Sequence, residues 1–208
     1  DPDLQALHAR VPMLCMWDDH EFTNDAYADG AQNHQPHEGD WQMRKRIAEQ
    51  AWREWMPVRD LGDTPYWSSY RLGDLGEIFL TESRISARSK PAEMDVPRGA
   101  DSAATMAAMK DFVSGDWQSP ARTMLGEAQE KWLADGFGRT GKSWNIWAQQ
   151  TIMGTVRQPE DTPSWLPPET PAFIRQRVAR GAIAAKAGIP TSLDAWDGYP
   201  LARARSLG

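Results

Sequence analysis

The feature that most constrains the fold is a short apolar run that ends abruptly in a polar cluster. Val11–Trp17 is apolar throughout, and Asp18-Asp19-His20-Glu21 follows directly. A run of this length is typical of a strand buried on both faces of a sheet, so we expect a strand over residues 11–17. Open α/β sheets usually bind ligands beyond the carboxyl ends of their strands. The polar cluster is therefore the first candidate site.

The composition argues against a nucleic-acid-binding protein, a protein with an internal disulfide and a membrane-spanning protein. The 208 residues carry 29 acidic and 23 basic side chains and a net charge of −6. Specific nucleic-acid binding is not expected, because a phosphate backbone is bound by basic surfaces. The single cysteine excludes an internal disulfide and a thiolate zinc cage, so a metal would need oxygen and nitrogen ligands. No stretch approaches the roughly 18 apolar residues of a membrane span, so no transmembrane segment is expected.

Hydrophobic periodicity and turn residues predict an α/β fold in a single domain over residues 1–208. The expected helices cover residues 43–56, 129–133 and 171–188, the last with Thr170 as its N-cap. Two strands joined by residues 73–76 are expected within 66–82, and a further buried strand over 144–148. Residues 23–41 predict a long loop, and the forty residues after Glu82 predict loop with one short helix.

The cluster at residues 18–21 combines three carboxylates and an imidazole. Carboxylates are hard ligands suited to calcium, magnesium, manganese or iron, so Asp18 or Asp19 can hold a metal whose bound water loses a proton readily. His20 can then protonate a leaving oxygen. The alternative is a solvated acidic turn. Neighbouring side chains on a strand point to opposite faces, so the cluster lines one site only if the chain turns here.

Other polar residues have both a functional and a structural interpretation. Arg84 and Arg88 follow a predicted strand, so a guanidinium can face the same edge as Asp19 and hold an anionic oxygen. The alternative is an ordinary ion pair between an arginine and a glutamate. His34 and His37 form either a metal clamp or part of a solvated loop. Cys15 lies inside the apolar run and is expected to be a core residue.

Tryptophan is used heavily, with 11 residues. Most tryptophans follow the spacing of the predicted helices and strands, which indicates core positions. The alternative function is a non-enzymatic, tryptophan-rich carbohydrate-binding module with structural calcium.

Several motifs occur in an order that extends over nearly the whole chain. The apolar run with Asp18-Asp19-His20-Glu21 and Asn24-Asp25 comes first. Then follow Trp55-Met56-Pro57-Val58-Arg59, Gly73-Asp74-Leu75, Glu82-Ser83-Arg84, Gln129-Glu130-Lys131-Trp132-Leu133, Trp144-Asn145-Ile146, and Asp194-Ala195-Trp196-Asp197-Gly198-Tyr199-Pro200 with Arg203. This order resembles the alkaline phosphatase D (PhoD-like) metallophosphoesterase family.

The resemblance implies a layered αββα fold, incomplete at both ends, and hydrolysis of phosphate mono- or diesters by a metal-activated hydroxide. It implies calcium and iron as metals and a periplasmic or extracellular parent protein. It further implies Asp19 or Asp18 as a metal ligand and His20 as the imidazole that assists the leaving group. Arg84 is a further candidate, either for a structural role or for binding the substrate phosphate.

The chain also departs from the metallophosphoesterase pattern. It lacks a Gly-Asp-x-His segment, and no histidine follows His37. It also begins at Asp1 without a methionine. We therefore expect the central portion of a longer phosphatase, with little or no activity of its own.

Overall fold

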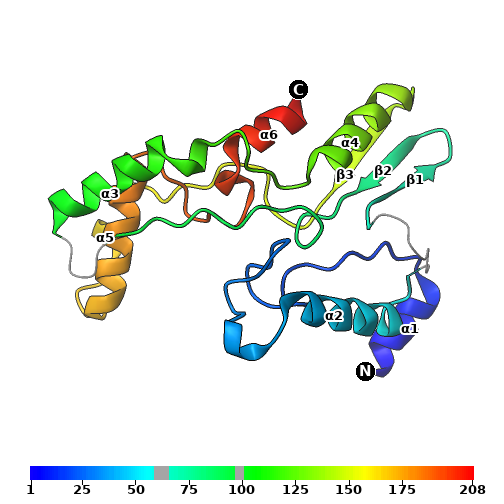
Figure 1. Ribbon diagram of the computed structural model, residues 1–208, viewed down its shortest axis with the longest axis horizontal. Coiled ribbons are helices and arrows are strands. Elements are labelled where there is room, and N and C mark those ends of the chain that lie inside the picture. The colour runs from blue at the N-terminus through cyan, green and yellow to red at the C-terminus, as the bar shows by residue number, and fades with distance from the viewer. Residues whose placement is uncertain (59–65, 97–100) are drawn as a thin grey trace. The chain divides into compact units, whose positions relative to one another are not determined.

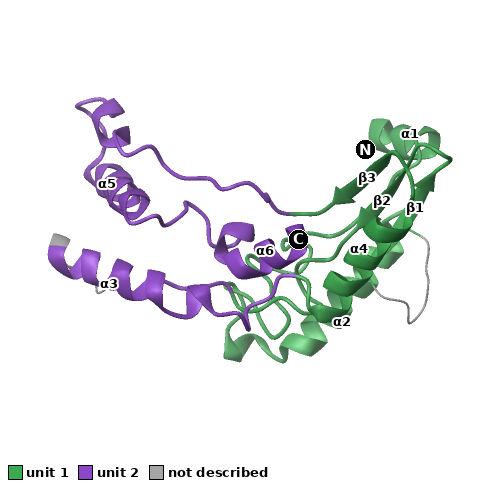
Figure 2. Ribbon diagram, turned by 90° about the horizontal axis from the view of Figure 1, so that it is seen from above, with its two compact units in different colours: residues 1–90, 125–150 green, residues 91–124, 151–208 purple. Residues whose placement is uncertain are grey.

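A computed structural model describes residues 1–58, 66–96 and 101–208, which form two compact units (Figures 1 and 2). Unit 1 comprises residues 1–90 and 125–150, and unit 2 comprises residues 91–124 and 151–208. Arg59, which belongs to one of the motifs above, lies outside the described residues. A single partial domain over residues 1–208 stays a prediction.

Unit 1 contains the expected helix over residues 43–56, which the structure places slightly earlier. Its helices are α1 (Pro2–Arg10), the 3-10 helix η1 (Pro36–Glu38), α2 (Trp41–Trp55) and α4 (Glu127–Arg139). Asp40 caps α2 by accepting a hydrogen bond from the Met43 backbone N–H at 2.8 Å. The helix α1, which starts at a capping Asp1 followed by Pro2, was not predicted from the sequence. Of α4, only one or two turns were predicted.

A three-stranded sheet stands beside α4 in unit 1 (Figure 1). Its strands are β1 (Ser68–Leu72), β2 (Gly76–Leu80) and β3 (Trp144–Ala148). The β1–β2 hairpin and β3 confirm the predicted strands. β1 and β2 are antiparallel, with Ser68 opposite Leu80, and β3 runs parallel to β2. The expectation that β3 is buried was wrong, because Trp144 is 63% exposed.

The helix α4 packs closely on the sheet through Phe79 of β2. The Phe79 ring lies edge-on to Phe137 at 4.9 Å and to Trp132 at 5.6 Å between ring centroids. Gly136 permits this approach, because a Cβ atom at that position would lie 2.3 Å from Phe79 Cε1.

The apolar run at residues 11–17 does not form a strand, so this prediction was wrong. Val11 and Leu14 are nearly half exposed, and no strand among the described residues pairs with the run. Only its end is buried: the Trp17 ring lies edge-on to Phe22 at 5.4 Å and to Trp52 at 5.0 Å. Apolarity alone does not supply the neighbouring strand that a ladder needs.

Unit 2 is mainly helical. Its elements are α3 (Ser102–Ser114), η2 (Asp116–Gln118), η3 (Thr162–Trp165), α5 (Ala172–Lys186), η4 (Trp196–Gly198) and α6 (Pro200–Leu207). The helix predicted from residue 171 is confirmed as α5, but its N-cap is Pro171 without a side-chain hydrogen bond, so Thr170 as the cap was wrong.

Buried Asp197 organises the end of unit 2. Its carboxylate accepts hydrogen bonds from Arg203 Nη1 at 2.6 Å and the Val156 N–H at 2.9 Å, and its carbonyl accepts one from Trp117 Nε1. The last motif of the sequence analysis thus has a structural role. None of the described helices has the length and apolar character to cross a membrane.

Candidate active site

The chain turns sharply at the polar cluster. The Asp19 carbonyl accepts hydrogen bonds from the backbone N–H groups of Phe22 at 2.8 Å and Thr23 at 2.7 Å. The Glu21 carboxylate accepts one from the Asp18 N–H at 2.7 Å. This turn removes the alternation of an extended strand, so neighbouring side chains of residues 18–21 can face one region.

Asp18 is held by an arginine from a distant segment. Arg84 Nε donates to Asp18 Oδ1 at 2.5 Å, although 66 residues separate the two in the sequence. The Arg84 side chain is only 4% exposed, whereas that of Asp18 is about half exposed. A charge-assisted bond of this kind is strong and directional. Arg84 therefore pairs with Asp18, and its predicted contact with substrate stays a prediction.

Asp19 is the better placed of the two aspartates for a metal. Its side chain is 12% exposed, and its Oδ2 accepts a hydrogen bond from the Asp25 N–H at 2.8 Å. Asp25 itself adopts a positive φ of 53°, a conformation that aspartate tolerates better than most residues. Asp19 Oδ1 lies 3.9 Å from Arg84 Nη2. This oxygen accepts no hydrogen bond from the residues that the structure describes, so it fits a single ligand bond to a hard cation.

The donor set does not complete a metal centre by itself. Among the described residues, no three His, Cys, Asp or Glu side chains come together in a group that could hold a metal ion. The cluster therefore fits the contribution of one ligand, with Asp18 largely neutralised by Arg84.

His20 projects from the same turn into solvent. Its side chain is 76% exposed, and its Nε2 lies 3.0 Å from Asn24 Oδ1 and 3.9 Å from Asp19 Oδ2. The hydrogen bond to Asn24, followed by the negative charge of Asp19, raises the pKa of His20. An accessible imidazole whose protonated form is favoured can donate a proton to a bound group.

Glu82 anchors this arrangement and was missed as a site residue by the sequence analysis. It is fully buried, and its Oε1 accepts hydrogen bonds from Trp17 Nε1 at 3.1 Å and from the N–H groups of Arg84 at 2.6 Å and Ile85 at 2.9 Å. Its Oε2 accepts from the N–H and hydroxyl of Ser86. Glu82 therefore fixes both the residue before Asp18 and the backbone that presents Arg84.

Gln129 of α4 holds the Glu82 backbone in turn. Its Oε1 accepts from the Glu82 N–H at 2.7 Å, and its Nε2 donates to the Glu82 carbonyl at 2.8 Å. The only sequence signal for this pair is that both residues belong to motifs of the family resemblance.

Of the remaining candidates, His34 and Arg88 have structural contacts. His34 Nε2 lies 3.1 Å from the Gly39 carbonyl, and its Nδ1 lies 3.4 Å from Arg44 Nη1, so it closes the loop before α2. His37 lies exposed in η1, and Cys15 is half-buried. Buried Arg88 donates to the Ala26 carbonyl at 3.3 Å.

The tryptophans do not share one environment. Trp41, Trp117 and Trp196 are buried, as their spacing predicted, and Trp17 is buried at the end of the apolar run. Trp55, Trp144 and Trp165 are largely exposed.

Comparisons with known proteins agree on one family. The family described as PhoD-like phosphatase matches residues 1–208. Alkaline phosphatase D of Bacillus subtilis (strain 168) is 29% identical over 216 aligned residues, which cover all of this chain and 30% of that protein. The solved structure titled "Structure of PhoD" is 26% identical and superposes with a TM-score of 0.67, covering 99% of this chain and 33% of that one.

The chain thus spans about a third of the length of these relatives. Its helices, its small sheet and the structural match confirm the α/β class, while the layered αββα arrangement and the incomplete ends stay predictions. Because the family match covers every residue, the sequence motifs, the fold and the relatives lead to one conclusion: this chain belongs to the PhoD-like phosphatase family.

Proposed function

We propose that this chain supplies the proton donor and one metal ligand for the hydrolysis of phosphate mono- or diesters. The observation that carries the proposal is the turn at residues 18–24, which places exposed His20 next to Asp19, a fixed and nearly buried carboxylate. Membership of a phosphatase family supports the reaction class.

His20 would protonate the leaving oxygen of the ester. Asn24 and Asp19 favour the protonated imidazole, and the exposed ring can reach a ligand in solvent. A positioned general acid of this kind typically contributes about 10²- to 10⁴-fold to the rate. The Asn24 side chain is itself held by Gln32 Oε1, so the ring has a preferred orientation.

Asp19 would hold a metal ion through Oδ1, the oxygen that no described residue occupies with a hydrogen bond. The calcium and iron that the family resemblance implies would polarise the phosphate ester when bound. The other ligands of a complete centre are not gathered among the described residues. We therefore also propose that these 208 residues alone turn over little or no ester.

Arg84 and Glu82 would act as positioning residues. Arg84 neutralises Asp18 and keeps its carboxylate at the turn, while Glu82 fixes the Arg84 backbone. Contact between Arg84 and the substrate phosphate is the secondary role that we propose for this residue. A periplasmic or extracellular location of the parent protein is likewise a proposal, supported only by the family resemblance.

The metal-binding role is tested by Asp19→Asn in the complete protein that carries these residues. Metal content is measured by mass spectrometry, and activity with p-nitrophenyl phosphate and bis-p-nitrophenyl phosphate. Asp29→Asn is the matched control, because Asp29 is an exposed aspartate of the following loop. We expect Asp19→Asn to lower metal content and to reduce turnover by about 100-fold or more. Metal content and turnover equal to those of the control would contradict the assignment.

A further inference from the structure

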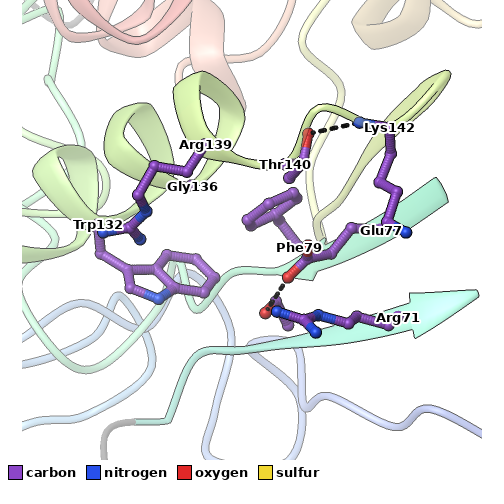
Figure 3. A pocket seen from close by; sticks show the side chains of 9 residues that line it. Arg71, Glu77, Phe79, Trp132, Gly136, Arg139, Thr140 and Lys142 are labelled. Carbon is purple, nitrogen blue, oxygen red and sulfur yellow. Dashed lines mark hydrogen bonds between the residues drawn. The ribbon is translucent and has the colours of Figure 1, made fainter. Parts of the chain in front are cut away.

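A pocket in unit 1 has a cationic lining that the proposed reaction does not use (Figure 3). The cavity measures about 280 Å³ and lies between β1, β2 and α4. Its main lining residues are Arg71, Glu77, Phe79, Trp132, Arg139 and Lys142. Figure 3 shows Arg71 extending from β1 and Arg139 from α4. The lining includes no residue of the turn at 18–24.

The pocket carries more positive than negative charge. The side chains of Arg71 and Arg139 form no hydrogen bond or ion pair with any residue that the structure describes. Lys142 Nζ contacts Asp74 Oδ1 at 3.0 Å, but the Asp74 side chain is fully exposed, so this ion pair is weak. Three cations therefore line a pocket with a single acid.

That acid, Glu77, forms no ion pair with Arg71. Glu77 lies directly opposite Arg71 in the β1–β2 register. Its carboxylate instead accepts a hydrogen bond from Ser69 Oγ at 2.6 Å. The Arg71 guanidinium therefore keeps all its donors available for a ligand.

The apolar wall of the pocket is closely packed. Phe79 is buried, and Gly136 allows α4 to approach its ring closely. Trp132 lies edge-on to the same ring. The position of Arg139 in the last turn of α4 is favoured by the helix dipole. The helix dipole does not account for the presence of Arg71, because Arg71 lies on a strand, β1, although it lines the same cavity.

We propose that this pocket binds a phosphate-type dianion, either inorganic phosphate or the phosphate group of a small ester. Guanidinium groups bind tetrahedral oxyanions through paired hydrogen bonds, and two of them line this cavity. The cavity volume suits a small ligand, and the Trp132 ring offers an apolar surface for an organic substituent. Binding here involves no bond cleavage, so the site is additional to the proposed phosphatase site and does not depend on it.

The test is ¹⁹F NMR of the complete protein labelled with 5-fluorotryptophan. The Trp132 resonance is assigned with Trp132→Phe. The probes are inorganic phosphate and phenylphosphonate, added at constant ionic strength. Phenylphosphonate is chosen because its carbon–phosphorus bond cannot be hydrolysed to phosphate. Arg71→Gln and Arg139→Gln remove one cation each. Arg10→Gln removes the same charge from an exposed position on α1 and is the matched control.

We expect a saturable shift of the Trp132 resonance, with the dissociation constant raised about tenfold or more by Arg71→Gln and by Arg139→Gln and unchanged by Arg10→Gln. Tighter binding of phenylphosphonate would identify an ester as the ligand, and tighter binding of phosphate would identify the free anion. The proposal is overturned if neither probe gives a saturable shift, or if the two pocket variants bind as tightly as Arg10→Gln.

Discussion

Glu82→Gln tests whether the buried carboxylate organises the segments around the candidate site. The carboxylate accepts three hydrogen bonds at Oε1 and two at Oε2. A glutamine can keep its oxygen toward the first three donors, but its NH₂ group then faces Ser86. The Ser86 hydroxyl can rotate to accept, whereas the Ser86 N–H loses its acceptor. An unsatisfied buried donor costs about 1–3 kcal/mol, and the remaining bonds lose their charge assistance. We therefore expect a loss of about 2 kcal/mol.

The loss is measured by urea unfolding of the complete protein, with Glu54→Gln as the matched control. Glu54 lies exposed on α2 and accepts one hydrogen bond from Gln50. Its replacement is expected to change the free energy of unfolding by less than about 0.5 kcal/mol. If Glu82→Gln destabilises no more than Glu54→Gln, the carboxylate does not anchor this region and the reasoning is refuted.

Two further predictions concern α4 and the loop before α2. Gly136→Ala places a methyl group against Phe79, so overpacking of about 1–3 kcal/mol should outweigh the better helix propensity of alanine. Gly138 has open space around it, so Gly138→Ala should be neutral or stabilising in the same urea assay. Equal stability of the two variants would disprove the close approach of Gly136 to the Phe79 ring. The hydrogen bond from the Gln35 N–H lowers the pKa of Glu38. This hydrogen bond therefore stabilises the fold fully above the pKa that Glu38 has in the unfolded chain, and the stabilisation is lost as the pH falls through the lower pKa of the folded state. NMR titration should find the Glu38 carboxyl below the usual glutamate range, and a value within or above that range would contradict the bond.

Local sequence signals predicted the elements whose determinants are local. The helix α2 follows its apolar periodicity and ends where Pro57 prevents continuation. The β1–β2 hairpin follows from a turn that contains Gly73, whose φ is +55°. In both cases the neighbouring residues alone select the conformation.

The contacts that shape the candidate site depend on residues far apart in the sequence. The two segments were expected at one edge of the sheet, but the partner of Arg84, Asp18, was not predictable from the sequence. Burial of Glu82 was not predictable, because acidic residues are rarely buried without a cation. The apolar run ending at Trp17 failed as a strand prediction for a similar reason, since a strand requires a partner that periodicity does not reveal.

Proton donation by His20 is tested most directly by the leaving-group dependence of kcat/KM. In the complete protein, His20→Ala is compared with wild type and with His37→Ala, which replaces an exposed histidine of η1. Phenyl phosphate needs a proton on its leaving oxygen, whereas 2,4-dinitrophenyl phosphate hardly does. We predict that His20→Ala lowers kcat/KM by about 10²-fold or more for phenyl phosphate and by less than about tenfold for the dinitrophenyl ester. An equal loss for both esters, or no loss relative to His37→Ala, would contradict the role of His20 as proton donor.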